Sequence, residues 1–335
     1  MKILFSGYHN PHFITITEYI ENAIIKLGHE LYTFDDRQHI IPGRIRSYIK
    51  YLNHVNLKYL NKKLLSLALK IKPDIAIING GHRITSNTLK LLANESICTV
   101  LWTTDVPINF QPILDSAQFY KYIFCLGTEA IQILKNSGIK CALWLPVGCD
   151  PVYHHKVDLS VEDQKKYSYD IVFVGSYYKN RAELLKELSH LNMAIWGPGW
   201  DELPENSPLR PLVKGAHTKP DTWKKIYTAS KIILSIHYQD PEHRFPVYQA
   251  SPRVFEALSC GAFVISDRQR DVLSLFKDRE HLVNFFDKND LQKKVTYYLE
   301  HTKERHRIAD AGQREVMSKH TYIHRLKKLL DLVNL

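Results

Sequence analysis

The stretch that decides the fold is residues 170–176, DIVFVGS, in which four apolar residues end on a glycine and a serine. Such a run predicts a buried β-strand followed by a turn into a helix. The chain opens in the same way, with KILFSG at residues 2–7. The plan of the first half therefore restarts near residue 170, which indicates two similar domains.

The first 150 residues alternate short β-branched or aromatic runs with helical patterns. Residues 14–27 carry apolar side chains at helical spacing and stop at Gly28. An alternation of strands and helices predicts a parallel sheet with binding loops at the carboxyl ends of its strands. The strands are predicted at residues 2–8, 30–34, 75–79, 99–103, 122–126 and 142–146.

A polar, lysine-rich segment at 158–169 separates this half from the second. There the same patterns predict strands at 170–176, 193–196, 212–216, 231–237 and 262–267, and helices at 181–190, 221–230, 252–260, 290–301, 303–319 and 322–333. The predicted fold class is α/β, with two Rossmann-like domains facing across a cleft. We expect domains at 1–155 and 168–318, followed by a C-terminal helix at 319–335.

Composition places the chain among ordinary globular proteins. It has 335 residues, of which 44% are hydrophobic and 24% charged, and no stretch approaches the roughly 20 apolar residues of a membrane helix. The N-terminus lacks the order of a signal peptide, and the five cysteines are never paired as C-x-x-C. We expect reduced core cysteines and a cytoplasmic location, with membrane association as an open possibility.

Positive charge is concentrated in one segment. The formal net charge is +10, and residues 37–72 contain nine Lys and Arg but no Asp or Glu. Interleaved apolar residues predict helices with one apolar and one basic face. The basic face either is solvated above the core or makes peripheral contact with an anionic membrane or a polyanionic acceptor.

The most specific local signal is the helix start at residues 251–261, SPRVFEALSCG. Ser251 suits the N-cap and Pro252 the first helical position, so free backbone N–H groups should face the preceding loop. Arg253 could neutralise a diphosphate there, and Glu256, on the same face, could accept hydrogen bonds from sugar hydroxyls. The alternative is a plain helical ion pair between these two residues.

A second phosphate candidate follows the strand at 170–174. Gly175 and Ser176 would let the backbone approach an oxyanion, and Arg181 begins the next helix. The chain contains no G-x-G-x-x-G, no P-loop, no H-E-x-x-H and no D-x-D. Nicotinamide chemistry, ATP hydrolysis and metal chemistry therefore lose their usual support, and we expect neither cofactor nor metal.

Several motifs of the second half resemble those of the CgeB-type, or spore-maturation-like, glycosyltransferases. They are DIVFVGS at 170–176, NR at 180–181, WGPGW at 196–200, SPRVFEALSCG at 251–261 and HTYIHR at 320–325. The resemblance covers about residues 168–328, and is thinner in the first half, at 102–107 and 148–151. It implies a GT-B fold similar to that of the family-four glycosyltransferases, with the donor bound by the C-terminal domain and the acceptor by the N-terminal one.

The resemblance also implies roles for single residues. Glu256 matches a glutamate that binds the nucleotide ribose, while Tyr248 stands where the broader family has a glutamate that contacts the donor sugar. Gly215 and His217 match a region near the nucleobase. The implied donor-binding residues are Gly175, Ser176, Arg181, Gly215, His217, Ser251, Arg253 and Glu256.

On the acceptor side, an inverting transferase needs a general base near the acceptor hydroxyl, in a strand-end loop of the first domain. Asp105 and His9 are the catalytic candidates, and His12 and His82 are the acceptor-binding candidates. Each has a structural alternative: Asp105 could cap a turn, and His12 could open the helix at residue 14.

The sequence thus predicts a metal-independent glycosyltransferase that moves a sugar from a nucleoside diphosphate sugar to a hydroxyl of a glycan, lipid carrier or protein. A nucleotide-sugar epimerase of the same fold is one alternative. A polyanion- or nucleic-acid-binding protein that uses residues 37–72 is another, disfavoured because no reading motif accompanies the charge. We therefore expect no nucleic-acid partner.

Overall fold

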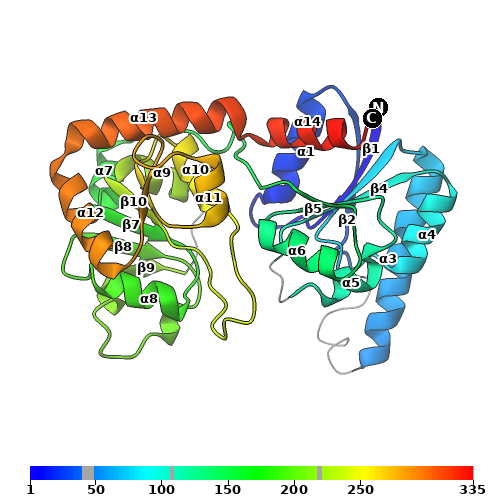
Figure 1. The fold of residues 1–335 in the computed structure, drawn as a ribbon, viewed down its shortest axis with the longest axis horizontal. Coiled ribbons are helices and arrows are strands. Elements are labelled where there is room, and N and C mark those ends of the chain that lie inside the picture. The colour runs from blue at the N-terminus through cyan, green and yellow to red at the C-terminus, as the bar shows by residue number, and fades with distance from the viewer. Residues whose placement is uncertain (40–48, 106–108, 217–220, 335) are drawn as a thin grey trace. The chain divides into compact units, whose positions relative to one another are not determined.

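The computed structural model describes residues 1–335 except 40–48, 106–108, 217–220 and 335. The chain forms two compact units, one of residues 1–146 and 325–335 and the other of residues 147–324. Each contains a six-stranded parallel sheet with helices around it (Figure 1). The predicted α/β fold with two Rossmann-like domains is confirmed.

The first unit has the strand order β2-β1-β3-β4-β5-β6. Its four inner strands are mostly apolar and buried, as strands covered on both faces by helices must be, whereas the two edge strands are less buried. The strands are β1 (Lys2–Gly7), β2 (Glu30–Asp35), β3 (Ile75–Asn79), β4 (Cys98–Thr103), β5 (Tyr122–Cys125) and β6 (Ala142–Trp144), and the helices are α1 (Ile16–Lys26), α3 (Lys50–Ile71), α4 (Ser86–Asn94), α5 (Gln111–Ala117) and α6 (Thr128–Asn136).

The second unit has the order β12-β11-β10-β7-β8-β9. Its strands are β7 (Ile171–Val174), β8 (Met193–Trp196), β9 (Val213–Gly215), β10 (Ile232–Ser235), β11 (Val264–Asp267) and β12 (Val283–Phe285). Its helices are α7 (Val161–Tyr167), α8 (Lys179–Lys186), α9 (Thr222–Ala229), α10 (Pro252–Ser259), α11 (Arg270–Leu275), α12 (Lys288–Glu300) and α13 (Thr302–Lys319), and α14 (Tyr322–Leu332) leads back to the first unit. The strand order reverses between β7 and β10.

The unit boundaries differ from the domain boundaries expected at 155, 168 and 318. Residues 147–167 lie with the second unit because they are bonded to it: Asp163 of α7 forms an ion pair with Lys225 of α9 at 2.9 Å, and the Val157 amide donates to the Thr228 hydroxyl. The segment expected as a polar separator contains α7, which begins with a capping box on Ser160.

Helix α3 carries the described part of the basic segment. Its Leu60 and Leu64 are buried, whereas Lys58, Lys62 and Lys63 are exposed. The predicted two-faced helix is confirmed for residues 50–71, and contact of its basic face with anionic lipid stays a prediction. In the part of the chain that the structure describes, no helix is long and apolar enough to span a membrane.

Candidate functional site

The candidate site of the second unit lies where the carboxyl ends of β7 and β10 diverge. In doubly wound sheets this reversal of strand order opens a crevice for ligands. Gly175 and Ser176 follow β7, and the chain that leaves β10 returns as α10. The sequence predictions at 175–181 and 251–256 therefore fall on one edge of one sheet.

Helix α10 begins as predicted. Pro252 is its first residue, and the Ser251 hydroxyl accepts a hydrogen bond from the Arg253 amide at 3.3 Å. The Arg253 side chain turns back to β7, where its Nε donates to the Val174 carbonyl and its guanidinium lies 5.0 Å from the centre of the Phe173 ring. Its Nη1 is buried and has no hydrogen-bond partner among the described residues.

Arg181 approaches the same ring from α8. Its side chain is only 6% exposed, and its guanidinium lies 5.5 Å from the centre of the Phe173 ring. Nε donates to the Ile236 carbonyl at 2.9 Å and Nη1 to the Ser176 carbonyl at 2.8 Å. Burial first, and the charge of Arg253 second, lower its pKa to about 9.

Neither arginine is neutralised. Within the described residues, Arg181 and Arg253 have no carboxylate within ion-pair distance. Two cations that share one apolar ring at a sheet edge repel each other, and a buried uncompensated charge is unfavourable. An anion bound at this edge would reduce the repulsion between the two arginines and would compensate their charge. Arginines without a carboxylate partner are typical of a phosphate site and not of a structural salt bridge.

Glycine is required where Arg253 meets β7. A Cβ on Gly175 would overlap the Arg253 Nη2 atom, and a Cβ on Gly197 would overlap the Gly175 carbonyl. Gly197 also has a φ of +144°, a backbone conformation that residues other than glycine rarely adopt. The predicted role of Gly175 is thus compatible with its position, although its immediate neighbour is a guanidinium.

Glu256 lies one turn into α10 and does not form the helical ion pair considered as an alternative. Its Oε1 is 3.9 Å from Nε2 of His154, a residue that precedes it by about a hundred positions. Although 27% of its side chain is accessible, removal of the carboxyl from water raises its pKa to about 7, and Arg253 offsets only part of that shift.

His154 is the neutral partner in this pair. Its Nδ1 accepts a hydrogen bond from the Asp150 amide at 2.8 Å, so the ring proton of the neutral form is on Nε2, which faces Glu256. The side chain is buried, and desolvation lowers its pKa to about 3. His154 therefore faces Glu256 as a neutral ring, with its N–H beyond hydrogen-bond distance of the carboxylate, and no local sequence pattern predicted this neighbour.

The pKa of Glu256 predicts an unusual pair of effects for Glu256→Gln. Because the folded-state pKa lies above the ordinary 4.5, the native state binds the extra proton between pH 4.5 and 7, and wild-type stability falls as pH rises through that window. We expect the variant to be more stable than wild type at pH 8, by up to about 3 kcal/mol, and no more stable at pH 4.5. Urea unfolding across this range measures the difference, and a difference that does not change with pH would contradict the assignment.

Two further residues stabilise the start of α10. His237, two residues beyond β10, contacts Asp267 at the end of β11, with 2.5 Å between Nδ1 and Oδ1. Its Nε2 accepts a hydrogen bond from the Ser251 amide at 2.9 Å. The contact with Asp267 and the bond from Ser251 connect both ends of the segment between β10 and α10. The sequence offered one sign of this pair, because the strands predicted at 231–237 and 262–267 end on His237 and Asp267.

Gly215 lies at the end of β9, where its carbonyl accepts a hydrogen bond from the Gly197 amide at 2.9 Å. It therefore belongs to the same edge of the sheet as Gly175. His217 lies outside the described residues. Of the two residues predicted near the nucleobase, the structure therefore describes only Gly215.

In the first unit, the structure brings together two of the four candidates. His82 follows β3, Asp105 follows β4, and their Nε2 and Oδ2 atoms are 2.7 Å apart. The hydrogen bond to Asp105 raises the pKa of His82, and partial burial offsets some of the shift. Asp105 also has a side-chain bond from Thr103 at 3.4 Å, so its carboxylate is engaged.

His9 and His12 are placed differently. His9 Nε2 is 2.8 Å from Oε1 of Glu21 on α1, and its Nδ1 is buried without a hydrogen-bond partner in the described residues. Burial raises the pKa of Glu21. His12 is exposed, and its amide donates to the Asn10 side chain. A buried Nδ1 and a side chain held by a helix make His9 a weaker base candidate than His82.

The described residues offer few ligands for a metal ion. No group of three or more His, Cys, Asp or Glu side chains within the described ranges could hold a metal ion. Positive charge at the candidate site comes from arginine.

Comparisons with known proteins bear on this geometry. Residues 180–331 match the model of a glycosyl transferase-like family. Spore protein CgeB of Bacillus subtilis is 22% identical over 262 residues, which cover 75% of this chain and 80% of that protein.

Solved structures agree over the whole chain. A sucrose-phosphate synthase from Thermosynechococcus elongatus superposes with a TM-score of 0.70 at 10% identity, covering 99% of this chain and 98% of the other. Anabaena HepE in complex with UDP-glucose gives 0.64 at 12% identity, covering 100% and 99%.

The chain has the GT-B fold of these structures, and most of its second unit matches the glycosyl transferase-like family. The resemblance to CgeB-type glycosyltransferases is confirmed.

Proposed function

We propose that the second unit binds a nucleoside diphosphate sugar without a metal ion. The observation that carries this proposal is a pair of guanidinium groups, the buried Arg181 and the half-buried Arg253, at the edge where β7 and β10 diverge. Neither has a carboxylate partner among the described residues. A diphosphate supplies the missing negative charge, and the half-buried guanidinium of Arg253 supplies donors for its oxygens.

The division of labour follows from the contacts. Arg181 donates to two backbone carbonyls, so it contributes charge and fixes the loop at Ser176. Arg253 contacts the diphosphate directly. Glu256, on the same helix as Arg253, accepts hydrogen bonds from the ribose hydroxyls. The structural neighbour HepE forms a complex with UDP-glucose, which supports a donor of this kind.

We propose a hydroxyl of a glycan, lipid carrier or protein as the acceptor, activated by His82 and not by Asp105. The Asp105 carboxylate accepts a hydrogen bond from the N–H at His82 Nε2. The other ring nitrogen, Nδ1, has no hydrogen-bond partner among the described residues and takes the hydroxyl proton. The hydroxyl oxygen then bonds to the anomeric carbon as the bond from that carbon to the diphosphate breaks. Direct displacement of this kind inverts the anomeric configuration.

A thermal-shift screen in EDTA tests donor binding and metal independence together. UDP-, GDP-, dTDP- and CMP-sugars are compared, each with excess EDTA and with Mn²⁺ or Mg²⁺. We expect at least one nucleoside diphosphate sugar to stabilise the protein equally in both conditions, by about 2.7 kcal/mol at 100 times its dissociation constant. Stabilisation that requires the metal would contradict the role given to the arginines.

A further inference from the structure

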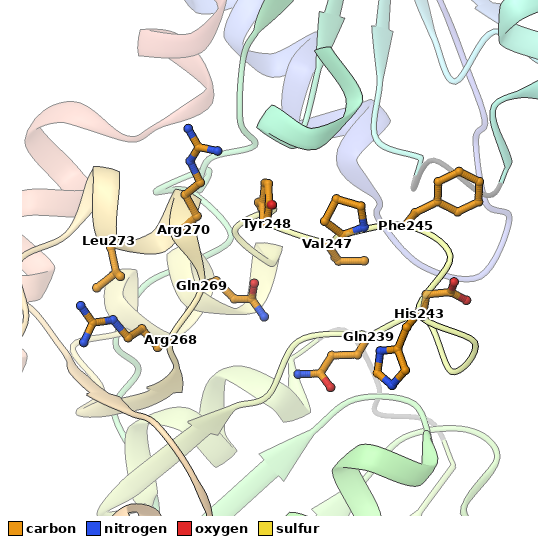
Figure 2. Close-up of a pocket in the computed structure, with 11 residues that line it drawn as sticks. Gln239, His243, Phe245, Val247, Tyr248, Arg268, Gln269, Arg270 and Leu273 are labelled. Carbon is orange, nitrogen blue, oxygen red and sulfur yellow. The ribbon is translucent and has the colours of Figure 1, made fainter. Parts of the chain in front are cut away.

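A cavity of the second unit lies beside the start of α10. It has a volume of about 710 Å³ and is lined by residues of two segments, 239–248 before α10 and 268–273 around the start of α11. This size is within the range of cavities that bind small molecules. Figure 2 shows the side-chain amides of Gln239 and Gln269 pointing toward one another, and Arg270 next to Tyr248.

The cavity is joined to the proposed donor site through covalent and hydrogen bonds. Tyr248 precedes the Ser251 cap by only three residues, and its carbonyl accepts a hydrogen bond from the Asp271 amide at 3.1 Å. Gln269 donates to Asp267 at 3.1 Å, and Asp267 is the carboxylate that contacts His237. Both segments that line the cavity are thus fixed to the start of α10, Tyr248 through the chain and Gln269 through Asp267 and His237.

The charges of the lining are divided between its two ends. At the loop end, Asp240 accepts hydrogen bonds from the amide and guanidinium of Arg244, which also pairs with Glu242 at 3.2 Å. Arg244 thus balances one of the two carboxylate charges there. The other end carries Arg268 and Arg270, and no carboxylate of the described chain is within ion-pair distance of either.

Aromatic rings hold these two arginines. The Arg270 guanidinium lies 5.3 Å from the centre of the Tyr248 ring, and that of Arg268 lies 4.6 Å from the centre of the Phe286 ring. A ring orients a guanidinium and leaves its full charge available to a ligand. The two amides suit neutral hydroxyls, whereas the arginine end suits a planar, singly charged acceptor.

We propose that this cavity binds the transferred sugar, and that the sugar carries a carboxylate that pairs with Arg270. The inference rests on the proposed function and adds the chemical class of the donor, a nucleotide-linked acidic sugar. Gln239 and Gln269 bind its hydroxyl groups. Arg268 strengthens the local positive potential.

The test compares matched donors that differ at one carbon. Calorimetry measures the affinity of UDP, UDP-glucose and UDP-glucuronate, and of GDP, GDP-mannose and GDP-mannuronate, for wild type, Arg270→Gln, Tyr248→Glu and the control Arg314→Gln on the exposed face of α13. We expect wild type and the control to bind one acidic donor about tenfold more tightly than its neutral partner. Arg270→Gln should remove this preference without changing affinity for the free nucleotide, and Tyr248→Glu should remove it through repulsion.

The outcomes separate the two proposals. Suppose that UDP or GDP binds, but that the acidic and neutral nucleotide sugars bind with equal affinity. That result would overturn the acidic-sugar assignment alone, and so would a preference for the acidic sugar that survives both substitutions. Failure of every nucleotide and nucleotide sugar to bind would overturn the donor site and this inference together.

Discussion

Replacing Arg253 with methionine will weaken binding of the nucleotide sugar by about a hundredfold, because it removes a charged donor that faces the diphosphate. Within the described residues no carboxylate pairs with Arg253, so its full charge is available to the ligand. The fold should tolerate the change. The substitution removes the hydrogen bond to Val174 and the cation–π contact with Phe173, but it also removes a cation that repels Arg181.

Isothermal calorimetry with the nucleotide sugar selected in the screen measures this loss, and circular dichroism checks the fold. Arg253→Lys keeps the charge but not the geometry of the guanidinium, so an intermediate loss is expected. Arg314→Met, on the exposed side of α13, is the matched control and should bind as wild type does. Unchanged affinity in a folded Arg253→Met protein would remove the basis for the donor site.

Much of the fold could be predicted because both halves follow one rule. Short apolar runs that end at polar loops indicated the strands, and nearly every observed strand overlaps its predicted range. The exception is β12, at Val283–Phe285, for which no strand was predicted. The start of α10 was also predictable, because Ser and Pro act locally there.

The chemistry of the site depends on partners that are distant in sequence, and this is where sequence reasoning ended. Spacing correctly put Arg253 and Glu256 on one helix face. It could not show that Arg253 would turn to a carbonyl 79 residues away, or that Glu256 would face His154, about a hundred residues away. The i, i+3 ion pair loses to these tertiary contacts because an exposed pair of that kind contributes only about 0.2–0.5 kcal/mol.

In the first unit, the topology explains why part of the prediction was within reach. β3 and β4 are neighbours, so the loops after them meet at one edge of the sheet and bring His82 to Asp105. The sequence did not show which of the two residues acts as the base and which one orients it. A carboxylate that accepts a bond from a histidine orients the ring and raises its pKa, which makes the histidine the better base near neutral pH.

His82→Gln is therefore expected to lower kcat by about 10²–10⁴, the range for loss of a general base, with little change in donor affinity. Wild-type kcat should fall on the acidic side as His82 becomes protonated, and this limb should be absent from the variant. Asp105→Asn should keep a limb but move it to lower pH, because the hydrogen bond that raises the pKa of His82 is lost. It should also lower the plateau, since the ring is no longer held.

The measurement is kcat against pH for both variants, with His54→Gln on the exposed face of α3 as the control. His9→Gln is the competing variant, because His9 makes the same kind of pair with Glu21 at 2.8 Å. Its Nδ1 is buried, so we expect its substitution to leave the acidic limb in place. A limb that disappears in His9→Gln and persists in His82→Gln would transfer the role of base from the loop after β3 to the loop after β1.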